Sequence, residues 1–233
     1  MFAGYAQLIN AIIERRRYSR YLEIGVQNGY NLSAIQCPHK DGVDLCCAAP
    51  ANFHLSSDDF FRKARQEGWM YDMIFVDGDH RFLPALRDIV NALDRLSPDG
   101  TVFIDNINPR TFADQSLGND GTVWRAWATL RVSRRDLTMV AIDAQRGWGI
   151  IRKEGGQELY AHEESQAGLP CYFGETWDLT WEYLEKFRVP LMNLVTLEHF
   201  EQSIFAAWFP VKEPPVAPPV LSLSDSTTPS QEP

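Results

Sequence analysis

The stretch Tyr71-Asp-Met-Ile-Phe-Val-Asp-Gly-Asp-His80 is the most informative part of this sequence. Its first half is a nearly continuous apolar run, which is typical of a strand buried on both faces of a parallel sheet. The run ends in two carboxylates and an imidazole. Polar side chains at the carboxyl end of a buried strand indicate an active site, so both fold and function are expected to depend on this segment.

Two further strand ends carry side chains of the same kind. Gly100-Thr-Val-Phe-Ile-Asp-Asn106 is a second apolar run that ends in oxygen ligands, and Tyr21-Leu-Glu-Ile-Gly-Val-Gln-Asn-Gly29 runs into a glycine loop. The carboxyl ends of parallel strands meet at one edge of a sheet. The three segments therefore predict a single crevice on an open α/β sheet.

Apolar runs and helical patterns alternate as far as residue 153, which predicts a doubly wound, Rossmann-like fold. We expect seven mostly parallel strands, the last two forming an antiparallel hairpin at one sheet edge. The expected strands cover 21–25, 42–47, 52–56, 72–77, 101–105, 137–143 and 147–153. The expected helices cover 2–18, 29–36, 57–67, 82–96 and 120–132.

The chain divides into three predicted regions. Residues 1–153 form the core with its N-terminal helix, and residues 154–209 form an aromatic-rich helical extension. That extension is expected to cover the core, although closing a substrate pocket or making a dimer contact are alternatives. Residues 210–233 hold seven of the 14 prolines beside Ser and Thr, so we expect this tail to be disordered.

Composition narrows the possible partners and the location. The 22 Lys and Arg against 31 Asp and Glu give a formal charge of −9, which disfavours nucleic acid and anionic membranes as partners. The four cysteines show no zinc-like spacing and are expected to be buried free thiols. There is no apolar run of about 18 residues and no signal-peptide pattern, so we expect a soluble, cytoplasmic protein. A homo-oligomer remains open.

The glycine loop indicates a nucleotide-like ligand but not a dinucleotide. Gly25 and Gly29 follow a strand and open a helix, where backbone can approach a ligand closely. Their spacing departs from G-x-G-x-x-G, which disfavours a nicotinamide oxidoreductase. Glu23 suits a cationic ligand, and Asp44 is placed to accept hydrogen bonds from ribose hydroxyls. Ser57 and Asp58, at the end of the third expected strand, are candidates for a purine edge.

These segments together resemble the class I S-adenosylmethionine (SAM) dependent methyltransferases, most closely the small sugar and natural-product O-methyltransferases. The resemblance covers about residues 20–153 and is carried by 22–29, 42–44, 56–61, 74–80 and 96–105. It implies that SAM is the cofactor. The residues it assigns to SAM are Glu23, Gly25, Asn28 and Gly29 around the methionine end, Asp44 at the ribose, Ser57 and Asp58 at the adenine, and Asp77.

A metal-dependent subgroup, which includes catechol-type enzymes, adds further assignments. The positions that match its ligands here are Asp77, Asp105 and Asn106, and three hard oxygen ligands suit Mg²⁺. The resemblance also implies that His80 is the general base, next to the catalytic Asp77. Asp79 could orient the imidazole. The alternative interpretations are a helix cap for the carboxylates, plain turn chemistry for Asp105 and Asn106, and a structural loop histidine for His80.

The sequence therefore predicts an O-methyltransferase, divalent-metal assisted, that methylates a hydroxyl of a sugar, glycan or polyhydroxylated natural product. Loops 107–121 and 155–180 are expected to line the acceptor side. Two alternatives stay open. One is a metal-independent O- or N-methyltransferase, and the other is a SAM-binding scaffold without turnover that holds a partner through its C-terminal region.

Overall fold

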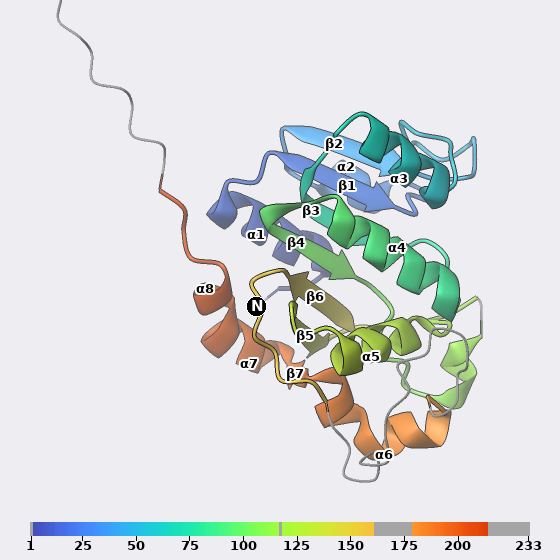
Figure 1. Cartoon of the computed structure of the whole chain (residues 1–233), viewed down its shortest axis with the longest axis vertical. Helices are drawn as coiled ribbons and strands as arrows, with labels where there is room; N and C mark the ends of the chain where they lie inside the picture. The colour runs from blue at the N-terminus through green and yellow to red at the C-terminus, as the bar shows by residue number, and fades with distance from the viewer. Residues whose placement is uncertain (1, 117, 161–178, 214–233) are drawn as a thin grey trace, which may run out of the picture.

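The computed structural model describes residues 2–116, 118–160 and 179–213 of the 233-residue chain. Its centre is a seven-stranded sheet with the order β2-β1-β3-β4-β6-β5-β7 (Figure 1). The first four strands pair in parallel, β6 runs antiparallel to β4 and β5, and β7 is parallel to β5. The predicted Rossmann-like, mostly parallel sheet with an antiparallel hairpin is confirmed. The strands are β1 (Arg20–Ile24), β2 (His39–Val43), β3 (Tyr71–Val76), β4 (Leu96–Ile104), β5 (Thr138–Asp143), β6 (Trp148–Arg152) and β7 (Leu194–Thr196).

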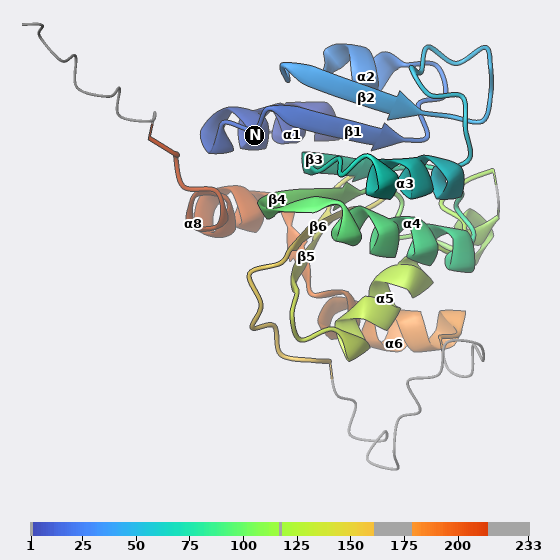
Figure 2. The same ribbon diagram turned by 45° about the horizontal axis from the view of Figure 1, so that its top comes forward.

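Helices cover both faces of this sheet (Figure 2). On one face α3, α4, α5 and α6 pack on residues such as Ile74 and Val102, and on the other α1 packs on residues such as Phe75 and Phe103. The two sets alternate along each strand because successive side chains point to opposite faces. The helices are α1 (Tyr5–Arg16), α2 (Tyr30–Ala34), α3 (Ser57–Gln66), α4 (Phe82–Asp94), α5 (Val123–Ser133), α6 (Trp181–Met192), α7 (Leu197–His199) and α8 (Phe205–Trp208), with a 3-10 turn at Phe112–Gln115 and a π-helical turn at Phe200–Ile204.

Two expected strand positions are wrong. Residues 52–56 form no strand, and only an isolated bridge joins Phe53 to Val43. The connection before them is too short for a crossover helix, so this segment cannot extend the ladder. The seventh strand is instead β7, which lies beside β5 and takes the edge that the hairpin was expected to occupy.

The C-terminal region contributes to both the sheet and its helical layers. Leu184, Leu191 and Met192 of α6 join the core beside α5. After α8 the chain returns to the end of α1, where the Lys212 amide donates to the Arg15 carbonyl at 2.8 Å. The predicted disordered tail lies almost wholly outside the described residues, as does most of loop 155–180.

The cysteine prediction needs a correction. Cys46 and Cys47 lie in the exposed loop after β2 rather than in a buried strand, and Cys37 is half-buried. All three are free thiols, and Cys171 falls outside the described residues. Across residues 2–116, 118–160 and 179–213, every helix is too short or too polar to cross a bilayer.

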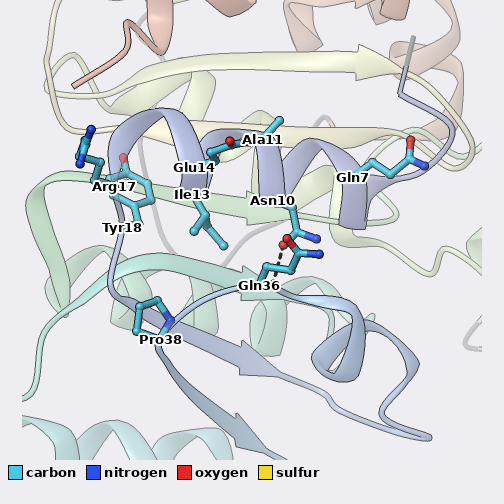
Figure 3. Close-up of a pocket in the computed structure, with 9 residues that line it drawn as sticks. All are labelled: Gln7, Asn10, Ala11, Ile13, Glu14, Arg17, Tyr18, Gln36 and Pro38. Atoms are coloured by element: carbon cyan, nitrogen blue, oxygen red, sulfur yellow. Dashed lines mark hydrogen bonds between the residues drawn. The ribbon is translucent and has the colours of Figure 1, made fainter. Parts of the chain in front are cut away.

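A surface groove of about 570 Å³ runs along α1 (Figure 3). Its lining includes Tyr18, two residues before β1, and Pro38, the residue before β2, so one end of the groove is at the amino-terminal edge of the sheet. Asn10 spans it by accepting a hydrogen bond from the Gln36 amide at 2.8 Å. This groove is not where the predicted site residues gather, because they follow the opposite, carboxyl ends of the strands.

One buried acid lies between the third and fourth helices. Asp88 of α4 is 3% exposed, and its closest polar influences come from Ser57 and Asp58 in the first turn of α3 and from Arg87. Burial raises the pKa of Asp88 to about 6, the charge on Asp58 adds to the rise, and Ser57 and Arg87 oppose it. The Asp88 side chain lies between the start of α3 and α4. Above about pH 6 it is ionised while buried, and this desolvation costs free energy.

Replacing Asp88 with Asn should stabilise the protein at pH 8. The folded-state pKa lies above the ordinary 3.8, so the folded state holds the proton more tightly and this group lowers the unfolding free energy as pH rises from about 4 to about 6. Two pKa units correspond to about 3 kcal/mol. We expect Asp88→Asn to regain about 1–2 kcal/mol at pH 8, because the neutral amide has nearly the same shape and avoids burying a charge.

Urea denaturation at pH 4, 6 and 8 tests this expectation. The gain should be absent at pH 4 and full at pH 8. Asp58→Asn makes the same change of charge at an exposed neighbour and should change stability by less than about 0.5 kcal/mol. A uniform loss of stability in Asp88→Asn at all three pH values would contradict the argument.

Candidate active site

The glycine loop is pressed against the end of β3. Gly25 has φ +89°, and a β carbon there would lie 2.0 Å from the Asp77 carbonyl oxygen. Gly29 has φ +77°, and a β carbon there would lie 2.2 Å from Cγ of Pro50. Both positions thus require glycine for conformation and for space. The loop can follow the backbone of β3 only because these side chains are absent.

Glu23 is buried on the α1 face of the sheet. Its Oε2 accepts hydrogen bonds from the Tyr21 hydroxyl and from Nδ2 of Asn31, each at 2.7 Å. Burial raises the pKa of Glu23 to about 7, and although those two hydrogen bonds oppose the rise, the charge on Asp77 adds to it. A cationic ligand nearby would favour the ionised carboxylate.

Asp44 follows β2 and is held by backbone amides. Its Oδ2 accepts from the Gln27 amide at 2.8 Å and its Oδ1 from the Cys46 amide at 2.7 Å. Each carboxylate oxygen has a second lone pair, so both can still accept from a ligand. Asn28, in the same loop, accepts from the Tyr30 amide at 3.2 Å. The structure therefore places Asp44 and Asn28 at the glycine loop, where their side-chain oxygens can accept further hydrogen bonds.

Ser57 and Asp58 form the first turn of α3 and are engaged with α4. Asp58 forms an ion pair with Arg87 at 3.2 Å, and Ser57 lowers the pKa of the buried Asp88. Ser56 caps the helix by accepting from the Asp59 amide at 3.1 Å. Their expected contact with adenine stays a prediction.

His80 lies between the end of β3 and a loop that precedes α5. Its Nδ1 is 2.6 Å from the Asn119 carbonyl, which can only accept, so Nδ1 carries the proton. Its Nε2 is 3.2 Å from Oδ1 of Asp77 and 3.0 Å from Nδ2 of Asn106. The hydrogen bond with Asp77 raises the pKa of His80 despite the opposing effect of burial. The catalytic nitrogen would therefore be Nε2, which faces the carboxylates.

Asp79 takes no part in holding the imidazole. Its carboxylate accepts from the backbone amide and Nε of Arg81, each at 2.9 Å. Arg81 is the residue that precedes α4. Asp79 thus orders the start of that helix, and within the described residues it makes no hydrogen bond to the imidazole that it was expected to orient.

Asp105 and Asn106 complete the group. Burial and the charge on Asp77 raise the pKa of Asp105 to about 7. Asn106 has φ +63°, a left-handed conformation that is uncommon for a residue other than glycine and is often found at functional sites. Oδ1 of each residue is enclosed and has no hydrogen-bond partner in the described structure. Two hard oxygen atoms are thus available to a ligand.

These oxygens fit a divalent cation, but they do not amount to a complete centre. In the described part of the chain no three His, Cys, Asp or Glu side chains are placed to hold one ion together. Asp77 and Asp105 would need the amide oxygen of Asn106, with water or substrate oxygens, to build an octahedral shell.

Sequence reasoning missed two contributors to this site. The loop before α5 holds His80 through Asn119, and its Thr122 amide donates to the His80 carbonyl at 2.7 Å. Tyr5, the first residue of α1, stacks on Phe75 with ring centres 5.2 Å apart. A backbone contact leaves no signal in side-chain patterns, and a tyrosine at helical spacing looks like any core residue.

Comparisons with known proteins bear on the family and on the fold. A family model described as a methyltransferase domain matches residues 47–107, which include Asp77, His80, Asp105 and Asn106. The O-methyltransferase from Bacillus cereus in complex with SAH is 14% identical, covers 65% of this chain and 81% of its own, and superposes with a TM-score of 0.50. Cofactor-bound Rv0187 from MTB is 15% identical, covers 67% and 82%, and has a TM-score of 0.52. No curated protein matches the sequence.

Residues 47–107 thus match a methyltransferase domain, and the seven-stranded sheet shares its fold with these two solved structures.

Gly25→Ala should abolish binding of S-adenosylhomocysteine (SAH), the demethylated form of SAM. The new methyl group would meet the Asp77 carbonyl, so the loop must move away from β3. Gly68→Ala is the matched control, because Gly68 has φ +69° but nothing within 4 Å of its β carbon. Both variants bear the cost of a left-handed alanine, roughly 1 kcal/mol. Calorimetry should show SAH binding lost only in Gly25→Ala, and equal binding by the two variants would contradict this account.

Proposed function

We propose that this protein is an O-methyltransferase that transfers the methyl group of SAM to a hydroxyl of a sugar, glycan or polyhydroxylated natural product, assisted by a divalent cation. The observation that carries the proposal is the group at the ends of β3 and β4. There His80 directs Nε2 at Asp77, while Oδ1 of Asp105 and of Asn106 have no hydrogen-bond partner among the described residues.

The chemistry assigned to these residues is the activation of an acceptor hydroxyl. Bound SAM supplies a methyl group on a positively charged sulfur, which leaves as a neutral thioether. As the new carbon–oxygen bond forms, the hydroxyl loses its proton, and Nε2 of His80 is the group proposed to receive it. Nδ1 stays bonded to the Asn119 carbonyl, so the ring keeps its orientation through the transfer.

The cation is proposed to bind Asp77, Asp105 and Asn106. A bound Mg²⁺ lowers the pKa of a coordinated hydroxyl and fixes its oxygen. The charge on Asp77 raises the pKa of Asp105, and this repulsion between neighbouring carboxylates is what a cation would relieve. Asn106, held at φ +63°, would contribute a neutral oxygen.

A metal-independent methyltransferase is the second candidate. It is favoured by the absence, among the residues the structure describes, of three His, Cys, Asp or Glu side chains that could share an ion. In that case His80 and Asp77 would act alone as the base and its partner. SAH release assayed with excess Mg²⁺ and again with EDTA separates the two candidates, since only the first loses activity with EDTA.

Asp44→Ala should weaken SAH binding at least tenfold. The variant removes both acceptors that the loop amides of Gln27 and Cys46 hold in place for the ribose. Calorimetry with SAH measures the loss, with Asp136→Ala as the control, because Asp136 forms only an exposed ion pair with Arg134. If the wild type binds no SAH with Mg²⁺ or with EDTA, the proposed function fails.

His80→Asn should lower turnover by roughly 10²–10⁴-fold and leave SAH affinity within about twofold. The Asn amide can replace Nδ1 as the donor to the Asn119 carbonyl, so the loop is kept while Nε2 is lost. The assay follows SAH release over a panel of sugars, polyols and catechols. Unchanged turnover in this variant would exclude His80 as the base.

A further inference from the structure

Tyr5 of α1 is placed at the carboxyl edge of the sheet by aromatic packing. Its ring stacks on Phe75 at 5.2 Å with an interplanar angle of 28°, and its centre is 6.5 Å from that of Phe103. The edge of Trp148 meets it at 6.3 Å. These three contacts come from β3, β4 and β6, so the position of the ring is fixed by the sheet rather than by α1 alone.

The strand register shows which groups lie next to this ring. Glu23 pairs with Phe75, and Phe75 pairs with Phe103, so the three form one row across β1, β3 and β4. Side chains alternate between the two faces of a strand, so residues two positions apart share a face. Asp77, two residues after Phe75, and Asp105, two residues after Phe103, are therefore on the same face as this row. The ladder continues that far, because the Asp77 amide donates to the Ile24 carbonyl at 2.9 Å.

The ring of Tyr5 thus packs on the face of the sheet that carries Glu23, Asp77 and Asp105, and their charges act on its hydroxyl. Burial, followed by the charges on Asp105, Asp77 and Glu23, raises the pKa of Tyr5 to about 12, so the phenol stays neutral. Within the described residues this hydroxyl makes no hydrogen bond. Oδ1 of Asp105 and Nε1 of Trp148 are also enclosed without a partner. Several polar atoms on one face of the sheet thus lack the partners that buried groups normally have.

A cation is the ligand that such surroundings favour, since the carboxylates repel anions and gain little from a neutral group. The methionine end of SAM carries an ammonium group, a sulfonium and one carboxylate, so its net charge is +1 and its two cationic groups suit these acids. The loop of Gly25, which touches Asp77, and the buried Glu23 lie on the same side of the site. This inference rests on the proposed cofactor. The observations favour the methionine end of SAM, rather than the neutral acceptor, as the neighbour of Tyr5.

We propose that Tyr5 is part of the SAM-binding site, and that its hydroxyl oxygen accepts a hydrogen bond from the α-ammonium group of the methionine end. The aromatic contacts hold the ring so that the ligand finds the hydroxyl already in place. Tyr5 positions the cofactor and takes no part in proton transfer.

The test compares two ligands that differ only at this end. SAH carries the ammonium and carboxylate groups of its amino acid portion, whereas 5′-methylthioadenosine keeps the adenosine and sulfur but lacks both groups. Tyr5→Phe preserves the ring and its stacking on Phe75 and removes only the hydroxyl. Calorimetry should show SAH binding weakened about tenfold, which is typical for a hydrogen bond to a charged group, and methylthioadenosine binding changed by less than twofold.

Tyr18→Phe is the matched control. Its hydroxyl contacts Thr101 at 3.1 Å, on the same face of β4 but four residues before Asp105. Both ligands should bind this variant as they bind the wild type. Thermal unfolding of each variant separates a loss of binding from a loss of fold.

Three results would overturn the inference. Unchanged SAH affinity in Tyr5→Phe would remove the hydroxyl from the cofactor site while leaving the proposed function intact. An equal loss for SAH and methylthioadenosine would mean a general disturbance of the site. Failure of the wild type to bind SAH at all would overturn both this inference and the proposed function, and so the two failures are distinguishable.

Discussion

The carbonyl oxygen of Asp77 occupies the space that a β carbon on residue 25 would need, 2.0 Å away. This close approach lets β1 and β3 stay paired up to their last residues and brings the glycine loop directly onto the end of β3. Because β4 pairs with β3 in turn, the same contact fixes the height of Asp105 relative to Glu23. The positions of most site residues are therefore set by backbone contacts between the strands. The face on which each side chain lies follows from the alternation of side chains along a strand.

The central part of this arrangement could be predicted from the sequence. Apolar runs that end at Asp77 and at Asp105 identify parallel strands, and parallel strands of one sheet end at the same edge, so their proximity follows without any structure. Asp44 and the glycine loop could be placed by the same reasoning. The apolar pattern at 52–56 was misleading, because the chain before it is too short to return for a parallel pairing. β7 was missed because three residues, Leu194–Thr196, carry too little periodicity to be recognised.

What the sequence could not supply are contacts between distant segments. Asn119 holds His80 through its carbonyl, which any residue could provide, and so its identity carries no information. Tyr5 has the same helical spacing as the core residues of α1, and only the register of β1, β3 and β4 shows that its hydroxyl faces acids. The orientation of Asp79 toward Arg81 likewise depends on the backbone at the start of α4.

The distribution of charge connects the site to its ligands. Glu23 and Asp105 have pKa values raised to about 7, and for each the charge on Asp77 contributes to the rise. Such a group destabilises the fold at neutral pH, and a bound cation offsets that cost. The chain as a whole carries −9, so its long-range field has the same sign. A cationic cofactor is attracted both by the acids of the site and by the net charge of the chain. A phosphorylated acceptor would be repelled by both. Among hydroxyl acceptors, we therefore expect the neutral ones to reach this site.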